Sequence, residues 1–385
     1  MKLNVCRRTL KLSRPLRTSY GELAERELLA VSITDRSGVS GHGEAAPLPR
    51  YGGVSLERVE RALARHAPVL ASSEDAGPDR LLEACRQADD QPVALAAIDL
   101  ALWDRAGRLQ GKPVARLLSE HPASEVPVNA ILPALDRAGV AEQAAAAARE
   151  GYECVKIKVG VGDDAARVAA ARAAGGARLA LRLDANGAWS VAEAVRAIDA
   201  LAPAGLELVE EPVHGLAAVR EVRERVAVRI AIDETAAEPG ALGAGVADAV
   251  CLKIARCGGI SRLLVAAALV RAHGGEVYLA STMDGPLGIA AALHAAAALA
   301  AHGPLAHCGL ATLALFDGLA NPLPARFGRI ALPPGPGLGV EPLKWSPSNA
   351  RTTPAGFSRG RRWPPAITAS SEWGSSSTIC RASAW

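Results

Sequence analysis

Five charged residues stand at the ends of five successive apolar runs in the middle of the chain. In order they are Lys158, Asp184, Glu210, Asp233 and Lys253. The intervals between them are 26, 26, 23 and 20 residues, about the length that one strand and one returning helix use in a parallel α/β unit. A charge at the end of a buried strand is costly unless it is paired or holds a metal. The spacing therefore predicts that all five side chains lie on one rim and form a site.

The three carboxylates of this series predict a site for a hard cation. Asp184, Glu210 and Asp233 would come from adjacent strands, and ligand sets made of oxygen atoms favour Mg²⁺, with Mn²⁺ as a substitute. Zinc is disfavoured, because no histidine or cysteine joins the three carboxylates in this pattern. A helix-capping role is the alternative for each carboxylate alone, but three in consecutive units favour the metal site.

The lysines predict proton transfer beside that cation. Lys156 and Lys158 are two residues apart on one strand and therefore point to the same, inward side. Lys253 arrives from the strand four units later, across the barrel from Lys158. A buried lysine beside a cation loses its proton more readily, so one lysine can remove a proton α to a carboxylate while the cation stabilises the enediolate. For Lys156 two roles are equally compatible with the sequence, namely an ion pair with a metal ligand and a contact with the substrate.

Length and composition limit the class of protein. The chain has 385 residues, half of them apolar, which suffices for a barrel-sized domain and a smaller one. We expect a cytoplasmic enzyme, because the longest apolar stretch, 289–301, is too short to span a bilayer and the N-terminus has no continuous apolar segment typical of a secretory signal. Seven scattered cysteines predict reduced thiols, and Cys154, Cys251 and Cys308 are interpreted as small buried hydrophobic residues.

The charge distribution favours small molecules as partners. The formal net charge is +3, but residues 345–385 hold five arginines and one glutamate, which leaves about −1 for the rest of the chain. A nearly neutral body lacks the basic stripe that nucleic-acid binding requires, and nothing in the sequence indicates a membrane partner. The expected ligand is a small carboxylate, and a homo-oligomer is compatible with the sequence.

The elements that must position the charged residues fall into two regions. Residues 1–122 alternate like antiparallel strands and then show helical periodicity over 55–69 and 92–109, which predicts an α+β cap. Over 123–310, eight strand-like runs alternate with Ala-rich helices that end in glycine. This rhythm predicts a closed barrel with the carboxyl end of every strand on one face. The eight runs are near 127–132, 155–159, 179–183, 206–209, 229–232, 249–254, 277–280 and 306–310.

The end of the chain has a different composition. Residues 344–385 are rich in Ser, Pro, Arg and Gly and have neither a helical nor a strand period. Such a composition cannot bury enough apolar surface to offset the entropy of ordering, so we predict disorder and assign no function. A basic tail that tethers the protein to an anionic surface is the alternative.

The motifs around the charged residues resemble those of the enolase superfamily, in its muconate-lactonizing-enzyme subgroup. The resemblance covers about residues 1–342. It rests on GHGEAAPLP and AAIDLALWDRAGRLQGKPVARLL in the cap, and on KIKVG, LDANGAW, VEEP, IDET and LKIARCGGI in the barrel. It implies a (β/α)7β barrel with an N-terminal α+β capping domain, which residues 311–343 help to complete.

The resemblance also assigns roles to individual residues. It implies a divalent metal held by the three carboxylates, with Lys158 and Lys253 as acid/base groups. In VEEP the first glutamate, Glu210, matches the ligand and Glu211 does not. The residues expected to contact the substrate or to support the ligands are Lys156, Asn186, Glu234, Ser281 and Asp284. For the last two, ordinary turn formation is an equal alternative.

The subgroup contains several reactions, among which the sequence favours one. These reactions are dehydration to o-succinylbenzoate, epimerisation of dipeptides, racemisation of N-acylamino acids and cycloisomerisation of muconate. Dipeptide epimerases usually carry Asp-x-Asp at the last strand, where we place Cys308 and Leu310. The stretch GLATLAL instead resembles the GL-x-T-x-x-L stretch of o-succinylbenzoate synthases. We therefore expect a lyase of menaquinone biosynthesis, with an epimerase as the alternative.

Two further expectations concern the cap and the class of function. Ser19, Tyr20 and the loop around Tyr51 are expected to influence specificity. A noncatalytic, metal-stabilised binding protein is the alternative from another class, but binding alone would not require two opposed lysines. Four histidines, His42, His214, His294 and His307, show no spacing with other residues that would indicate a catalytic or metal-binding role, and we interpret them as structural.

Overall fold

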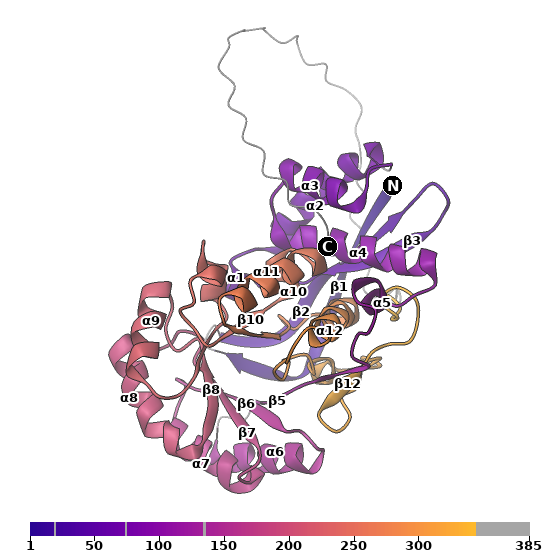
Figure 1. Cartoon of the computed structure of the whole chain (residues 1–385). Helices are drawn as coiled ribbons and strands as arrows, with labels where there is room; N and C mark the ends of the chain where they lie inside the picture. The colour runs from indigo at the N-terminus through magenta and orange to yellow at the C-terminus, as the bar shows by residue number, and fades with distance from the viewer. Residues whose placement is uncertain (19–20, 74, 134–135, 344–385) are drawn as a thin grey trace, which may run out of the picture. The chain divides into compact units, whose positions relative to one another are not determined.

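A curled parallel sheet forms the centre of the molecule (Figure 1). The computed structural model describes residues 1–343 apart from 19–20, 74 and 134–135. The disorder predicted for 344–385 and the roles expected for Ser19 and Tyr20 therefore lie outside the described residues.

Seven strands of the described chain follow one another in sequence order across this sheet. They are β5 (Ala130–Leu132), β6 (Cys154–Lys158), β7 (Ala180–Asp184), β8 (Leu206–Glu210), β9 (Ile230–Ile232), β10 (Ala249–Leu252) and β11 (Glu276–Leu279). All neighbouring pairs are parallel. Their apolar runs suit a sheet whose two faces are both covered.

The sheet closes through a short eighth segment. Val128 pairs with Cys308 and Ala280 pairs with Gly309, both in parallel orientation. The eighth run, expected near 306–310, is therefore present as bridging residues between the first and last strands rather than as a regular strand. The predicted capped barrel is the fold observed.

The first predicted run, 127–132, divides into two parts. Its beginning belongs to β4 (Glu125–Pro127), which pairs antiparallel with β12 (Arg329–Ala331). The barrel receives β5, together with Val128 and the carbonyl of Pro127, which pair with Cys308.

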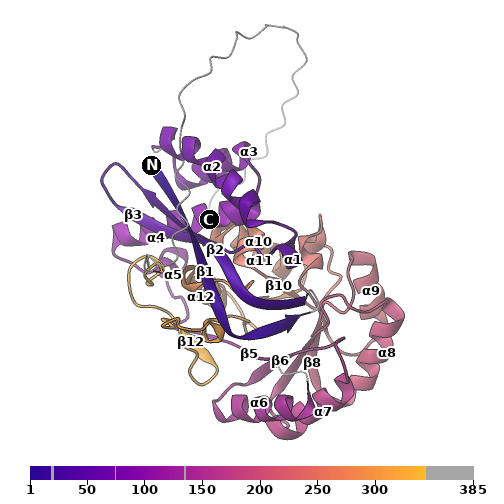
Figure 2. The ribbon, with the colours of Figure 1, turned by 180° about the vertical axis from the view of Figure 1, so that it is seen from behind.

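Helices pack around the outside of the barrel (Figure 2). They are α6 (Arg137–Arg149), α7 (Asp164–Gly175), α8 (Val191–Leu201), α9 (Leu216–Arg225), α10 (Ile254–Cys257), α11 (Ile260–Ala272) and α12 (Pro286–Ala300), with short 3-10 turns at Ala202–Ala204, Thr235–Ala237, Ala241–Gly243 and Leu313–Leu315. Asp136, Asp163 and Ser190 cap α6, α7 and α8 by accepting backbone N–H groups. Among helices of the described residues, none combines the length and the apolar character that a membrane span requires.

The N-terminal part forms an antiparallel sheet covered by helices. Its elements are β1 (Lys2–Thr18), β2 (Gly21–Thr34), β3 (Ser40–Ala45), α1 (Pro49–Gly52), α2 (Leu56–Ser72), α3 (Pro78–Ala88), α4 (Pro92–Gln110) and α5 (Val114–Leu118). The β1–β2 hairpin reaches toward the barrel (Figure 2). Helix α3 lies outside the predicted helices, and its buried residues are Leu81 and Cys85.

The segment after the barrel returns to this N-terminal part. Phe316 bridges to Leu12 of β1, and the amide of Val114 donates to the carbonyl of Gly337 at 2.8 Å. The division at residues 122 and 310 into cap and barrel domains stays a prediction.

One buried arginine joins the cap to the loop after β11. Arg26 is 2% exposed. Its guanidinium donates to the carbonyls of Ala46 at 3.0 Å, Pro47 at 2.7 Å and Met283 at 3.3 Å. These three bonds fix the position of the chain just before α1 relative to the loop after β11. Both segments border the cavity described below.

Two buried carboxyl groups, Glu44 and Asp284, lie near this guanidinium. Glu44 Oε1 accepts the amide of Gly285 at 2.6 Å, at the N-terminus of α12, where unpaired amides favour a carboxylate or carboxyl oxygen. A β-carbon at Gly285 would lie 2.4 Å from Oε2 of Glu44, so a larger residue there would displace this carboxyl group. Burial, and then the charge of Asp284, raises the pKa of Glu44 to about 8.

Glu44→Gln should change the pH dependence of folding. The pKa of Glu44 rises from its ordinary 4.5 to about 8 in the native protein, so the native state keeps a proton that the unfolded chain releases between these values. The free energy of unfolding should therefore fall as pH rises through this window, by at most about 1.4 kcal/mol per pH unit, and glutamine should remove that contribution. Urea unfolding from about pH 5.5 to about pH 7.5 measures it.

The matched control is Asp75→Asn, whose carboxylate is 93% exposed. This control should keep the wild-type slope. Equal slopes for wild type and Glu44→Gln would contradict a buried, protonated Glu44.

Candidate active site

The structure brings the five charged residues of the series to one end of the barrel. Lys158, Asp184 and Glu210 are the last residues of β6, β7 and β8. Asp233 and Lys253 directly follow β9 and β10. Because the strands are parallel, these positions share the carboxyl-terminal rim. The three carboxylates are at most 1% exposed, so their charges must be balanced by neighbouring groups.

Lys156 supplies much of that balance. Its Nζ donates to both oxygens of Glu210 at 2.8 Å and lies 2.7 Å from Oδ2 of Asp184. Burial opposes the charge on Lys156, but Asp184 and Glu210 together raise its pKa well above the ordinary value. Lys156 makes an ion pair with two candidate ligands and also lines the cavity, so the structure is compatible with both roles expected for this lysine.

The two carboxyl groups beside Lys156 respond differently to burial. For Asp184, burial opposes ionisation, but Lys156 and Lys158 lower the pKa to about 2. Lys158 lies 2.5 Å from Oδ2 of Asp184. For Glu210, burial prevails over the nearby Lys156 and raises the pKa to about 7. Burial thus makes Glu210 harder to ionise than Asp184, which two lysines contact.

On the other side of the rim, a cap residue joins Lys253 and Asp233. Tyr51 of α1 donates its hydroxyl hydrogen to Oδ2 of Asp233 at 2.5 Å and accepts a hydrogen bond from Lys253. Lys253 also contacts Asp233 directly, and its Nζ lies 4.3 Å from the centroid of the Tyr51 ring. Arg256 binds Oδ1 of Asp233 at 3.0 Å. The hydroxyl group of Tyr51 thus connects the cap to the charged groups at this end of the barrel.

Glu211, the glutamate that the sequence pattern sets apart from the ligands, holds the end of β9. Its carboxylate accepts the amides of Asp233 at 2.7 Å and Thr235 at 2.9 Å, and contacts Nδ1 of His214 at 2.9 Å. The φ of Glu211 is 41°, a conformation that costs about 1–3 kcal/mol and persists only when its surroundings enforce it. The two adjacent glutamates therefore differ in role: Glu210 faces the site, whereas Glu211 positions Asp233.

The supporting residues expected from sequence are partly brought to the site. Lys158 donates to Oδ1 of Asn186 at 2.5 Å, and Nδ2 of Asn186 donates to Glu234 at 3.0 Å. Ser281 lines the cavity. Asp284 does not lie among the residues that line it; its side chain is buried behind them, where it accepts a hydrogen bond from Thr282 and faces Arg26.

A cavity lies between the β1–β2 hairpin and the rim. Its charged side is formed by the lysines, Asp184 and Asp233. Much of the remaining lining consists of apolar side chains, namely Leu16, Leu23, Leu48, Ile131, Pro133 and Met283. Glu22 from the hairpin also borders it. A small carboxylate with an apolar body would match these two sides.

The last strand differs from expectation by one residue. Cys308 and Leu310, which we placed at the substrate positions, are fully buried in the core, whereas Gly309 and Thr312 line the cavity. A register shift of one residue moves each side chain to the other face, so the sequence-based placement was wrong. The described cavity still receives no carboxylate from this segment.

The donor set at the rim suits a hard divalent cation. Asp184, Glu210 and Asp233 offer only oxygen atoms, the ligands that Mg²⁺ prefers. Carboxylate oxygens of Glu210 and Asp233 lie within 4.8 Å of each other and of the Cys251 thiol, which sequence reasoning treated as a buried hydrophobic residue. Burial, and then the charge of Asp233, raises the pKa of Cys251, so this thiol stays protonated beside the oxygen donors.

Comparison with known proteins finds two family models that match the chain. The one described as mandelate racemase / muconate lactonizing enzyme, N-terminal domain, matches residues 2–119. The one described as enolase C-terminal domain-like matches residues 139–345.

Individual proteins and structures agree with these models. Muconate cycloisomerase 1 of Rhodococcus opacus is 31% identical over 354 residues, covering 86% of this chain and 92% of that protein. An o-succinylbenzoate synthase of Mycobacterium tuberculosis is 43% identical over 205 residues, covering 50% of this chain and 59% of that protein. The structure of a dipeptide epimerase from Enterococcus faecalis, complexed with Mg and the dipeptide L-Leu-L-Tyr, has a TM-score of 0.80 and 28% identity, and the match covers 88% of this chain and 98% of that one.

Lys156→Met should destabilise the protein strongly. The change leaves Asp184 and Glu210 buried without the ammonium that they share, and breaking a buried ion pair typically costs about 3–5 kcal/mol. Urea unfolding in the absence of divalent cations measures this loss. Lys112→Met, at an exposed position, is the control and should change the free energy of unfolding by less than about 0.5 kcal/mol. A Lys156→Met protein as stable as this control would refute the role of Lys156 in balancing the two carboxylates.

Proposed function

The chain belongs to the mandelate racemase and muconate lactonizing enzyme group of the enolase superfamily, and from this premise we propose that it is an o-succinylbenzoate synthase. The chemistry common to this superfamily is abstraction of a proton α to a carboxylate. The proposed reaction continues this step with loss of a hydroxyl group from the cyclohexadiene precursor in menaquinone biosynthesis.

One observation carries the proposal of proton transfer. Lys158 and Lys253 both line the cavity beside buried carboxylates, and their strands, β6 and β10, are four positions apart in the closed barrel. Two basic groups therefore approach a bound substrate from opposite sides. A binding protein would need only one positive charge to hold a carboxylate, whereas proton removal and charge stabilisation use both.

The metal site is part of the proposal. Asp184, Glu210 and Asp233 would hold Mg²⁺, with Mn²⁺ as a substitute, and the Mg-complexed epimerase structure supports this choice. When bound, the cation would supply the positive charge that stabilises the anion formed as the α proton leaves.

In the proposed reaction Lys158 performs two steps on one face of the substrate. As a neutral amine it takes the proton α to the ring carboxylate, and as an ammonium it then gives a proton to the departing hydroxyl group, so that one water molecule is lost. Asn186, at 2.5 Å from Lys158 Nζ, orients this amine. Burial opposes the charge on Lys253, but Asp233 raises its pKa, which suits a lysine that stays cationic and stabilises the intermediate.

Two features support dehydration over the other reactions of the group. The Mycobacterium tuberculosis synthase has the highest identity of the relatives named above, although over half of the chain. The last barrel segment supplies Gly309 and Thr312 to the cavity rather than the paired aspartates that dipeptide epimerases usually carry. We also propose a cytoplasmic location, with small carboxylates rather than nucleic acids or membranes as partners.

The main alternative is epimerisation or racemisation at an α carbon. Its support is the structural match to a dipeptide epimerase that binds L-Leu-L-Tyr, together with the apolar wall of the cavity, which would accept a hydrophobic side chain. In that reaction each lysine would serve one face of the carbon, so both would exchange protons with the substrate. Cycloisomerisation of muconate is a further alternative, supported by the Rhodococcus opacus relative.

Turnover of the cyclohexadiene precursor by the purified protein with Mg²⁺ tests the proposal. We expect aromatisation that is lost in Lys158→Ala and reduced in Lys253→Ala, while the exposed Lys112→Ala behaves as wild type. L-Ala-L-Xaa dipeptides in deuterated water provide the counter-test. Deuterium incorporation into a dipeptide without aromatisation would favour epimerisation, and absence of both reactions would contradict the proposal and leave racemisation of N-acylamino acids, cycloisomerisation of muconate and a noncatalytic protein as the alternatives.

Removal and return of the cation test the metal site separately from turnover. Chelation should abolish activity, and Mg²⁺ should restore it. Because a ligand that binds only the native state raises its stability, Mg²⁺ should also raise the melting temperature of the wild type, and should do so much less in Glu210→Gln. An equal rise in both proteins would mean that Mg²⁺ binds elsewhere.

A further inference from the structure

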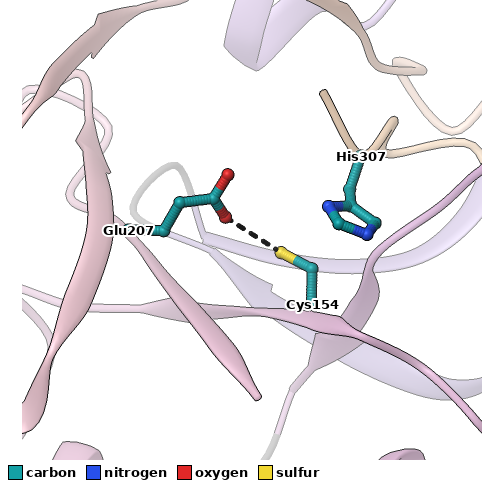
Figure 3. A group of neighbouring side chains, drawn as sticks. All are labelled: Cys154, Glu207 and His307. Carbon is teal, nitrogen blue, oxygen red and sulfur yellow. Dashed lines mark hydrogen bonds between the residues drawn. The ribbon is translucent and has the colours of Figure 1, made fainter. Parts of the chain in front are cut away.

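A second group of possible metal ligands lies at the opposite end of the barrel. Cys154 is the first residue of β6, Glu207 is the second residue of β8, and His307 precedes the bridging residue Cys308. Figure 3 shows these three side chains turned toward one another. One ligand atom from each lies within 4.8 Å of the other two. The group is at the amino-terminal ends of strands whose carboxyl-terminal ends carry the candidate active site.

We propose that Cys154, Glu207 and His307 bind a divalent transition metal, with Zn²⁺ as the first choice. Sulfur, imidazole nitrogen and carboxylate oxygen together are the ligand set of zinc. The rim differs, because its carboxylates suit Mg²⁺. The two ends of one barrel would thus select different metals through the softness of their ligands.

The contact between thiol and carboxylate is the core of the proposed site. Sγ of Cys154 donates to Oε2 of Glu207 at 3.4 Å, and Cys154 is fully buried. A cation that binds both atoms would replace the thiol proton that now lies between them. Metal binding deprotonates a cysteine ligand, so uptake of the metal should release a proton.

The imidazole is oriented by a second carboxylate. Nε2 of His307 lies 3.4 Å from Oε2 of Glu153, while the side of the ring that carries the other nitrogen faces Cys154 and Glu207 (Figure 3). A carboxylate on the far nitrogen is the usual partner of a metal-bound histidine, since it sets the tautomer and the direction of the ring. The side chains of His307 and Glu207 are 22% and 24% exposed, which leaves access for the metal and for a water as fourth ligand.

Arg182 binds the carboxylate of Glu207 but leaves some of the acceptor positions of that carboxylate free. Its guanidinium binds both oxygens of Glu207 at 2.8 Å, donates to the carbonyl of His307 at 2.6 Å and stacks over Tyr278 at 4.8 Å from the ring centroid. A carboxylate has about four acceptor positions, so positions for a metal remain.

The charges balance when the metal is bound. The thiolate and the carboxylates of Glu207 and Glu153 contribute three negative charges. A divalent metal and Arg182 contribute three positive ones. A neutral site of this kind avoids the cost of an uncompensated charge near the barrel core.

The test uses the full-length protein, freed of metal by chelation and then supplied with excess Mg²⁺ to occupy the rim. Co²⁺ is the probe, because its thiolate complexes have a charge-transfer absorption that oxygen ligands do not produce. We expect one Co²⁺ per chain with this absorption in the wild type and in Cys251→Ser, and its loss in Cys154→Ser. Cys251→Ser is the matched control, since its thiol lies beside the rim carboxylates.

Two further variants keep the proposal testable if Cys154→Ser does not fold. His307→Gln should weaken Co²⁺ binding by at least about tenfold, and Glu153→Gln, which changes only the orienting carboxylate, by about 10–100-fold. Absence of the absorption from the wild type, its persistence in Cys154→Ser, or its loss only in Cys251→Ser would overturn the proposal. Unchanged affinity in His307→Gln would overturn it as well.

Discussion

The burial of three carboxylates at one rim of the barrel is the constraint on which the site depends. Asp184, Glu210 and Asp233 are almost without contact with water, and buried charge is stable only when it is matched by opposite charge. Lys156 binds two of them, while Lys253 and Arg256 bind the third. Two of these cations, Lys156 and Lys253, also line the cavity, so the same lysines balance the buried charge and face the candidate site.

The cap takes part in this arrangement through few residues. The hydroxyl group of Tyr51 forms hydrogen bonds with both Asp233 and Lys253. Arg26 holds the chain just before α1 and the loop after β11. Glu44 closes the N-terminus of α12. The cap thus supplies Leu16, Leu23 and Leu48 to the apolar lining of the cavity and also contacts the charged groups of the barrel.

The barrel organises polar groups at both of its ends by the same alternation of side chains. Cys154, Lys156 and Lys158 are spaced by two along β6, so they point to one side. The last two reach the rim, and the first lies beside Glu207 and His307 at the other end. Arg182 and Tyr278 are buried near the end of the barrel that holds Cys154, and they stack on each other. A single strand therefore contributes to two chemically different environments.

The sequence by itself determined the order of the barrel strands and the rim positions of Lys158, Asp184, Glu210, Asp233 and Lys253, because strand alternation and crossover length are local properties of the chain. It also distinguished Glu210 from Glu211 through the family motif. Only the tertiary structure decided how Lys156 is shared between two carboxylates, that Asp284 lies behind the cavity, and that Gly309 rather than Cys308 or Leu310 faces it. It alone brought Tyr51 to Lys253 and His307 to Cys154. These outcomes depend on barrel closure and on docking of the cap, which join residues far apart in the chain, and no local pattern encodes such contacts.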